Sequence, residues 1–199
     1  MKKTYFKNLT VLLLAFLPLI VVQGQNAIDY EHRRFEKAIK KTLDTKNFRL
    51  YQPEYFKKSS IPKESTGKYF KAIANNDTSE FIYAYAGRVN TCRTGGCNAG
   101  NQSKDMGAEY FDYFILFTEN NEVKQVEVFN YQATYGFEIT SRGWLKQFKG
   151  FSGETELKSG NEIDAISGAT KSVESITKDV MLRTEEIRML TQNKSGIKN

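Results

Sequence analysis

The chain of 199 residues carries 29 Lys and Arg against 23 Asp and Glu, for a net charge of +6, and 40% of its residues are hydrophobic. A chain of this length can build one domain with its own core. Three of the lysines lie within the first seven residues and no dense basic run follows, so the charge gives no indication of DNA or RNA binding.

The N-terminal segment has the pattern of an export signal. Its three lysines precede an almost wholly apolar stretch at residues 9–22, and a small residue follows at position 24. The stretch is shorter than the roughly 20 residues that span a bilayer. We therefore expect residues 1–24 to be a cleaved signal peptide and the protein to be periplasmic or otherwise extracytoplasmic, with an uncleaved anchor as the alternative. Cleavage leaves 175 of the 199 residues and lowers the net charge from +6 to about +3.

Cys92 and Cys97 are the two cysteines of the chain, and two glycines lie between them. In an exported protein such a pair predicts a disulfide, and a redox-active dithiol is the alternative. Metal binding is disfavoured because two thiolates lack nearby partners and the single histidine, His32, is distant in sequence.

The first half of the chain mixes helical and extended patterns. Apolar residues recur at helical spacing in residues 26–46, with His32 on the apolar face, and we expect a packing helix there. Residues 48–68 contain two prolines and a polar run, so they are expected to connect elements with little regular structure. The remaining expectations are a short helix at 69–75, a strand at 80–89 and a loop at 92–107.

The second half begins with the clearest hairpin of the sequence. Residues 110–118 and 123–131 alternate, with turn-forming residues between them. One amphipathic turn is expected at 144–148, and a long helix at 172–190 with Ser172 as its N-cap. One stripe of that helix is apolar: Val173, Ile176, Val180, Ile187 and Leu190. The mixed order of strands and helices predicts an α+β fold, an antiparallel sheet with flanking helices in a single domain.

Just before the last helix stands the segment Asp164-Ala-Ile-Ser-Gly-Ala-Thr170. The free N–H groups and the positive dipole end of a first helical turn favour a phosphate there. Gly168 and Ala169 carry almost no side chain, so a bulky group can approach the backbone. The segment therefore predicts a phosphate-bearing group close to the Thr170 hydroxyl.

This segment resembles the Asp-x-x-Ser/Thr-Gly-Ala-Thr motif of the FMN-binding domain family, which includes components of the sodium-pumping NADH:quinone reductase and of the Rnf complex. The resemblance implies that Thr170 carries FMN through a phosphoester bond made by a flavin transferase. It also implies a cofactor-binding role for the residues around Thr170, namely Asp164, Ser167, Gly168, Ala169, Lys171 and Ser172. Asp164 is expected to order the loop or to be recognised by the transferase.

The resemblance extends over roughly residues 80–182, and we expect an N-terminal helix and connecting segment at 25–79, the FMN-binding domain at 80–192 and a tail at 193–199. In a turn that the family also carries, Thr134 and Gly136 keep their places, whereas Ala133 and Tyr135 depart from the usual Glu and Pro. The flavin ring would need aromatic neighbours, for which the candidates are Tyr135, Phe137, Trp144 and Phe151. The candidate cations for its phosphate are Arg142, Lys149 and Lys171.

Taken together, the sequence predicts an exported flavoprotein that carries FMN covalently and transfers electrons outside the cytoplasm. Its expected partners are a flavin transferase and a membrane or periplasmic redox protein. Two alternatives stay open: a reductase that holds FMN without a covalent bond, and a cofactor-free module that binds a partner protein. No Ser-His-Asp set, catalytic carboxylate pair or nucleotide-hydrolase phosphate loop is present in the sequence.

Overall fold

A computed structural model describes residues 27–57, 67–75, 77, 79–93 and 108–192 of the chain. The elements follow one another in this order: α1 (Arg33–Thr42), β1 (Phe48–Tyr51), α2 (Glu54–Lys57), β2 (Gly67–Ala74), β3 (Phe81–Arg93), β4 (Ala108–Phe117), β5 (Val123–Gln132), η1 (Phe137–Thr140), α3 (Arg142–Leu145), η2 (Lys146–Phe148) and α4 (Thr170–Gln192). Among the described residues, no helix combines the length and the apolar character that a membrane span requires.

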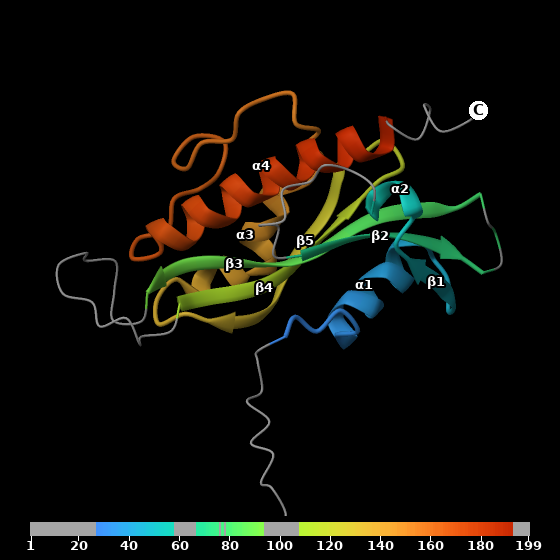
Figure 1. Cartoon of the computed structure of the whole chain (residues 1–199). Coiled ribbons are helices and arrows are strands. Elements are labelled where there is room, and N and C mark those ends of the chain that lie inside the picture. Colours follow the sequence, from blue (N-terminus) through green and yellow to red (C-terminus); the bar gives the residue numbers. More distant parts are fainter. Residues whose placement is uncertain (1–26, 58–66, 76, 78, 94–107, 193–199) are drawn as a thin grey trace, which may run out of the picture.

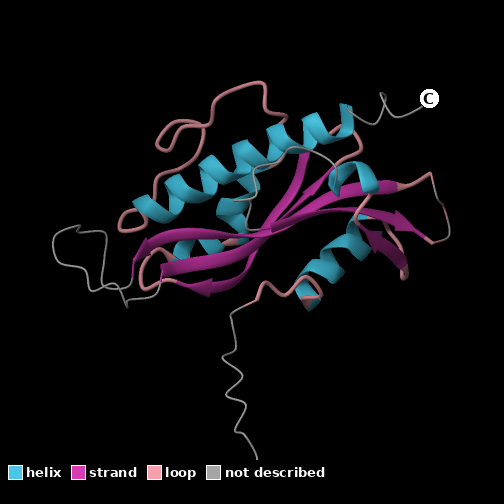
Figure 2. Cartoon of the chain, in the orientation of Figure 1, coloured by secondary structure: helices cyan, strands magenta, loops and turns pink. Residues whose placement is uncertain are grey.

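The five strands form one antiparallel sheet in the order β1-β2-β3-β4-β5, so neighbours in the chain are neighbours in the sheet. Helix α4 covers one face and α1 the other (Figures 1 and 2). The predicted α+β class with an antiparallel sheet in one domain is confirmed. β1 and β2, which lie in the expected N-terminal segment, belong to the same sheet as β3 to β5.

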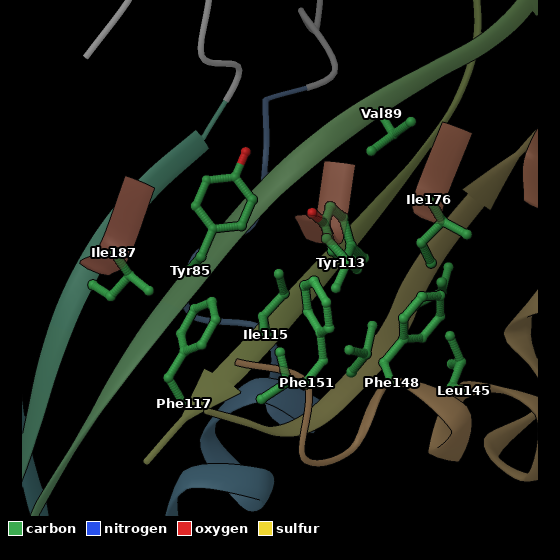
Figure 3. Close-up of a cluster of buried hydrophobic side chains, with 14 of the residues drawn as sticks. Tyr85, Val89, Tyr113, Ile115, Phe117, Leu145, Phe148, Phe151, Ile176 and Ile187 are labelled. Carbon is green, nitrogen blue, oxygen red and sulfur yellow. The ribbon is translucent and has the colours of Figure 1, made fainter. Parts of the chain in front are cut away.

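The larger core lies between the sheet and α4. Side chains of β3 and β4, such as Tyr85, Tyr113 and Phe117, meet Ile176 and Ile187 of α4 (Figure 3). All five residues of the predicted apolar stripe of α4 are buried. The three-to-four-residue spacing of that stripe turns one side of the helix toward the sheet, which fixes where its N-terminus lies.

A smaller core lies under α1. Phe35 and Ile39 of the helix pack against Phe70, Phe114 and Leu116 of the sheet. The helix is shorter than the predicted 26–46 because His32 ends it on the N-terminal side. Nδ1 of His32 accepts the Arg34 N–H at 3.2 Å, and its ring stacks on Phe129 at a centroid distance of 4.7 Å.

The predicted short helix at 69–75 is wrong, because these residues form β2. Tyr69 faces the α4 core while Phe70 and Ala72 face the α1 core, so both sides of the strand are covered by apolar groups. The period-two alternation that marks a half-exposed strand is therefore weak here, and pairing with β1 and β3 decides the structure. Residues 48–68 likewise hold more structure than predicted, since β1, α2 and the start of β2 lie there.

The hairpin of β4 and β5 is confirmed. The turn closes through the Thr118 N–H, which donates to the Glu122 carbonyl at 2.8 Å, and Asn121 takes a left-handed φ of 68°. The strand predicted at 80–89 is confirmed and continues to Arg93. Of the predicted disulfide, the side chain of Cys92 and the whole of Cys97 lie outside the described residues, as do the predicted signal peptide and tail.

Candidate functional site

Thr170 is the first residue of α4, and its side chain is exposed. The first helical hydrogen bond runs from the Val173 N–H to the Ala169 carbonyl at 2.9 Å. In the described part of the chain, the backbone N–H groups of Thr170, Lys171 and Ser172 have no acceptor. An exposed hydroxyl thus stands beside three free donors at the positive end of a 23-residue helix.

The loop before Thr170, residues 164–169, is called the attachment loop here. Its last turn closes through the Ala169 N–H, which donates to the Ile166 carbonyl at 3.1 Å. Gly168, the third residue of that turn, has a φ of +80°, which residues with a Cβ rarely adopt. A Cβ on Gly168 would meet no atom within 4 Å. The turn therefore needs a glycine for its backbone and leaves open space beside it.

Ala169 has a different role from the one the sequence predicted. Its side chain is 2% exposed and packs in the core under α4 together with Ile163. The methyl group anchors the loop, while Ser167, Gly168 and Thr170 on either side stay exposed. Only Gly168 provides the predicted open approach to the backbone.

Trp144 of α3 and Gln147 of η2 hold the start of the attachment loop in place. Trp144 of α3 donates its Nε1–H to the Asp164 carbonyl at 2.9 Å, and the Asp164 N–H donates to Oε1 of Gln147 at 2.7 Å. Gln147 also donates to the Trp144 carbonyl at 3.0 Å. The Asp164 main chain thus orders the loop, and its carboxylate is exposed with no partner among the described residues.

The turn at residues 133–136 approaches the start of α4 from the other side. Gly136 has a φ of +91°, and a Cβ there would lie 2.5 Å from Oγ of Ser172. Tyr131 donates its hydroxyl to the Tyr135 carbonyl, so the hydrogen bond of 3.1 Å between Tyr131 and Ser172 must use the Ser172 proton. Burial raises the pKa of Tyr131, and the hydrogen bond that its oxygen accepts from Ser172 offsets part of that rise.

Ser172 is therefore not the predicted N-cap. It lies within the first turn of α4, is 4% exposed and is committed to Tyr131. The helix begins two residues earlier than predicted because the buried Ala169 supplies the first accepting carbonyl. Thr134 is held by Glu109, whose carboxylate accepts both the N–H and the hydroxyl of Thr134.

Two exposed aromatic side chains flank this junction. Tyr135 is 72% exposed and Phe137 is 66% exposed, and Phe137 stands edge-on to Tyr131 at 5.6 Å. Trp144 is partly buried. Phe151, by contrast, is 8% exposed and belongs to the core under α4, and its carbonyl accepts the N–H of Val123 at the start of β5.

The three candidate cations also lie in different places. Lys171 lies in the first turn of α4, where it pairs with Glu174 at 3.2 Å. Arg142 pairs with Glu127 at 3.2 Å, and both Arg142 and Lys149 line a cleft between α3 and α1. Of these three cations, Lys171 is the one that lies next to the attachment loop.

Three clefts in the described part of the chain, with volumes of about 580, 470 and 470 Å³, are lined by residues other than Thr170 and the attachment loop. Within the described residues there is also no cluster of three or more His, Cys, Asp or Glu that could hold a metal ion. The site combines a helix terminus that has three free N–H groups with an exposed aromatic surface.

Residues 111–181 match the FMN-binding domain family. The match runs from within β4 into α4 and includes Gly136, Trp144 and the whole attachment loop. It supports a flavin-binding protein with FMN as its cofactor. A search of curated proteins gave no match.

Sequence reasoning missed three residues that hold this site together. Gln147 and Tyr131 fix the loop and the turn on the two sides of Thr170. Gln147 follows Trp144 by three residues, so the two share a helical face. This spacing could have indicated that Gln147 and Trp144 contact the same part of the chain. For Glu109 the sequence carries no comparable signal, because its partner Thr134 lies 25 residues away.

The residues present fit FMN. Its phosphate would meet the free N–H groups and the hydroxyl at the start of α4, where Gly168 leaves space. Its ring would find apolar surface on Tyr135 and Phe137.

Proposed function

We propose that this protein carries FMN esterified to Thr170 and transfers electrons to or from a partner protein outside the cytoplasm. The observation that carries the proposal is the exposed Thr170 hydroxyl beside three free N–H groups, next to the open space at Gly168. The match of residues 111–181 to the FMN-binding domain supports the identity of the cofactor.

The ester requires an activated donor. The donor would be FMN joined through its phosphate to the phosphate of a nucleoside monophosphate. Thr170 Oγ1 would form a bond to the FMN phosphorus as the anhydride bond breaks, the nucleoside monophosphate would leave with the bonding electron pair, and the hydroxyl proton would pass to a base of the transferase. The free N–H groups at the start of α4 would stabilise the negative charge of the phosphate during this exchange. The exposed carboxylate of Asp164 is accessible to the flavin transferase that carries out the reaction.

The exposed position of Thr170 and of its aromatic neighbours favours electron transfer to a partner protein. FMN supplies one- and two-electron redox chemistry when bound. A flavin beside the exposed side chains of Tyr135 and Phe137 would be accessible to a partner protein.

The proposed location depends on the sequence of residues 1–24, with its basic start and apolar stretch. Covalent attachment is useful there because it prevents loss of the cofactor where free flavin is scarce. The expected partners are the transferase and a membrane or periplasmic redox protein.

The test is co-expression with a flavin transferase, followed by flavin fluorescence on a denaturing gel and intact-mass measurement of the exported protein. Wild type and Thr170→Ser should retain flavin and gain the mass of one FMN less one water. Thr170→Ala should lose both signals, whereas Ser167→Ala should keep them. Flavin retained in Thr170→Ala, or released entirely by acid from wild type, would contradict the ester.

A further inference from the structure

The largest of the three clefts lies on the α1 face of the sheet and has a volume of about 580 Å³. One wall is α1, which contributes Arg34, Lys37 and Lys41. These residues are three and four positions apart, so they share one helical face. The floor includes Lys124 and the apolar Val126 of β5, and α1 adds the apolar Ala38.

The opposite wall is the segment of α3 and η2. It contributes Arg142, Lys146 and Lys149, with the buried Leu145 behind them. We call this surface the basic cleft. Trp144 and Gln147 of the same segment hold the main chain of Asp164, so this wall connects the basic cleft to the attachment loop.

One carboxylate, that of Glu127, lines the basic cleft, and it already has hydrogen-bond and ion-pair partners. Glu127 is 5% exposed as a side chain, bonds to Arg142 at 3.2 Å, lies 4.0 Å from Arg34 and accepts a hydrogen bond from Gln125 at 3.1 Å. It therefore fixes one arginine on each wall. The five lysines of the cleft have no carboxylate within 4 Å in the described part of the chain.

The cleft accounts for the net charge of the chain. It contains seven of the 29 Lys and Arg and one of the 23 Asp and Glu, which leaves 22 cations and 22 carboxylates elsewhere. Removal of the three lysines of the predicted signal peptide would make the rest of the protein acidic. Such a concentration of one sign in a concave surface attracts an anion of several charges.

We propose that the basic cleft binds a small polyphosphorylated anion, such as a nucleoside diphosphate or triphosphate. The five unpaired lysines converge from two walls and the floor, which suits a compact ligand better than a flat surface. The volume of about 580 Å³ falls within the range of small-molecule sites. The apolar side chains between the lysines would contact the uncharged part of the ligand.

The site is distinct from the proposed FMN site, because no residue of the attachment loop lines it. Bound anion would remove the mutual repulsion of the lysines and stabilise the fold.

The test is calorimetric titration of the flavin-free protein with tripolyphosphate and ADP, with AMP and FMN as single-phosphate comparisons. Tripolyphosphate and ADP should bind and raise the melting temperature, and their affinity should fall steeply with salt. The cleft variant Lys37→Glu/Lys146→Glu should bind at least about tenfold more weakly. The control Lys46→Glu/Lys178→Glu changes the net charge equally at exposed positions outside the cleft and should bind as wild type does.

Equal affinity of the two double variants, or no binding of either polyphosphate to wild type, would overturn the proposal. So would tighter binding of FMN than of ADP. Poly-glutamate and vesicles of anionic phospholipid are the macromolecular comparisons: binding of one of these through Lys37 and Lys146, without binding of ADP or tripolyphosphate, would assign the cleft to a macromolecule. Lys124→Ala alone provides a second variant with a smaller change in charge.

Discussion

Gly136 packs so closely on Ser172 that a Cβ at position 136 would lie 2.5 Å from the Ser172 hydroxyl oxygen. The same glycine has a φ of +91°, so both its backbone and its neighbour exclude a side chain. This contact joins the turn after β5 to the first turn of α4. The position of Thr170 relative to Tyr135 and Phe137 depends on it.

Gly136→Ala should therefore lower the free energy of unfolding by about 2–4 kcal/mol, since the strain of a positive φ and an overpacking cost add. Gly150→Ala is the matched control, because Gly150 has a φ of +87° but a Cβ there would meet nothing within 4 Å. It should cost only about 1 kcal/mol. Urea denaturation measures the free energy of unfolding of both variants. Equal losses in the two would show that the contact with Ser172 does not contribute to stability.

A second prediction concerns the hydrogen bond between Gln147 and Asp164. Gln147→Ala removes the acceptor of the Asp164 N–H and should cost about 1 kcal/mol. Because the bond lies in a loop, the local effect should exceed the global one: exchange of the Asp164 amide hydrogen should accelerate while core amides change little. Gln132→Ala, an exposed residue bonded to Asn130, is the control. An unchanged Asp164 exchange rate would mean that Trp144 alone holds the loop.

Much of the fold and part of the site follow from sequence patterns. The hairpin of β4 and β5 has strong alternation and turn-forming residues, and the stripe of α4 repeats at helical spacing. The sequence also placed Thr170 next to that helix, because glycine, alanine and a hydroxyl residue precede an apolar periodic segment. It set the start of the helix two residues too late, at Ser172, because the burial of Ala169 is a tertiary property.

Other features depend on contacts between distant residues, which a single sequence does not reveal. β2 has apolar residues on both faces because α1 and α4 each cover one of them, and that coverage is a tertiary property. Lys37 and Lys146 line the same cleft although more than a hundred residues separate them. Charged residues of α4 resemble a solvated face, yet Arg183 and Glu186 are buried.

Those buried charges give a third prediction. Arg183 bonds to Asp179 at 2.9 Å and to Glu186 at 2.7 Å, and its side chain is 6% exposed. Arg183→Met would leave two carboxylates without their cation and should lower the free energy of unfolding by about 3–5 kcal/mol. Lys178→Met on the exposed side of α4 should change it by less than about 0.5 kcal/mol. Chemical denaturation of both variants provides the measurement, and a small effect of Arg183→Met would show that water reaches the pair.

A fourth prediction follows from the tyrosines that bond to the same carboxylates. Tyr69 donates its hydroxyl to Glu186, and Tyr113 donates to Asp179. Burial, together with the neighbouring carboxylate, raises the pKa of Tyr69 and of Tyr113 well above the usual value near 10. The folded protein therefore keeps both protons at a pH where the unfolded chain releases them.

The sign of the effect follows from this difference in bound protons. The stabilisation is fully present below pH 10 and is lost as the pH rises above it, by up to about 1.4 kcal/mol per pH unit for each tyrosine. Guanidinium unfolding between about pH 8 and about pH 11.5, with tyrosinate absorbance followed in parallel, measures the loss, since this range spans the pKa of an unfolded tyrosine. Tyr69→Phe/Tyr113→Phe should flatten the decline above pH 10, because neither side chain then has a proton to lose. An equally steep decline in the double variant would assign the alkaline instability to other groups.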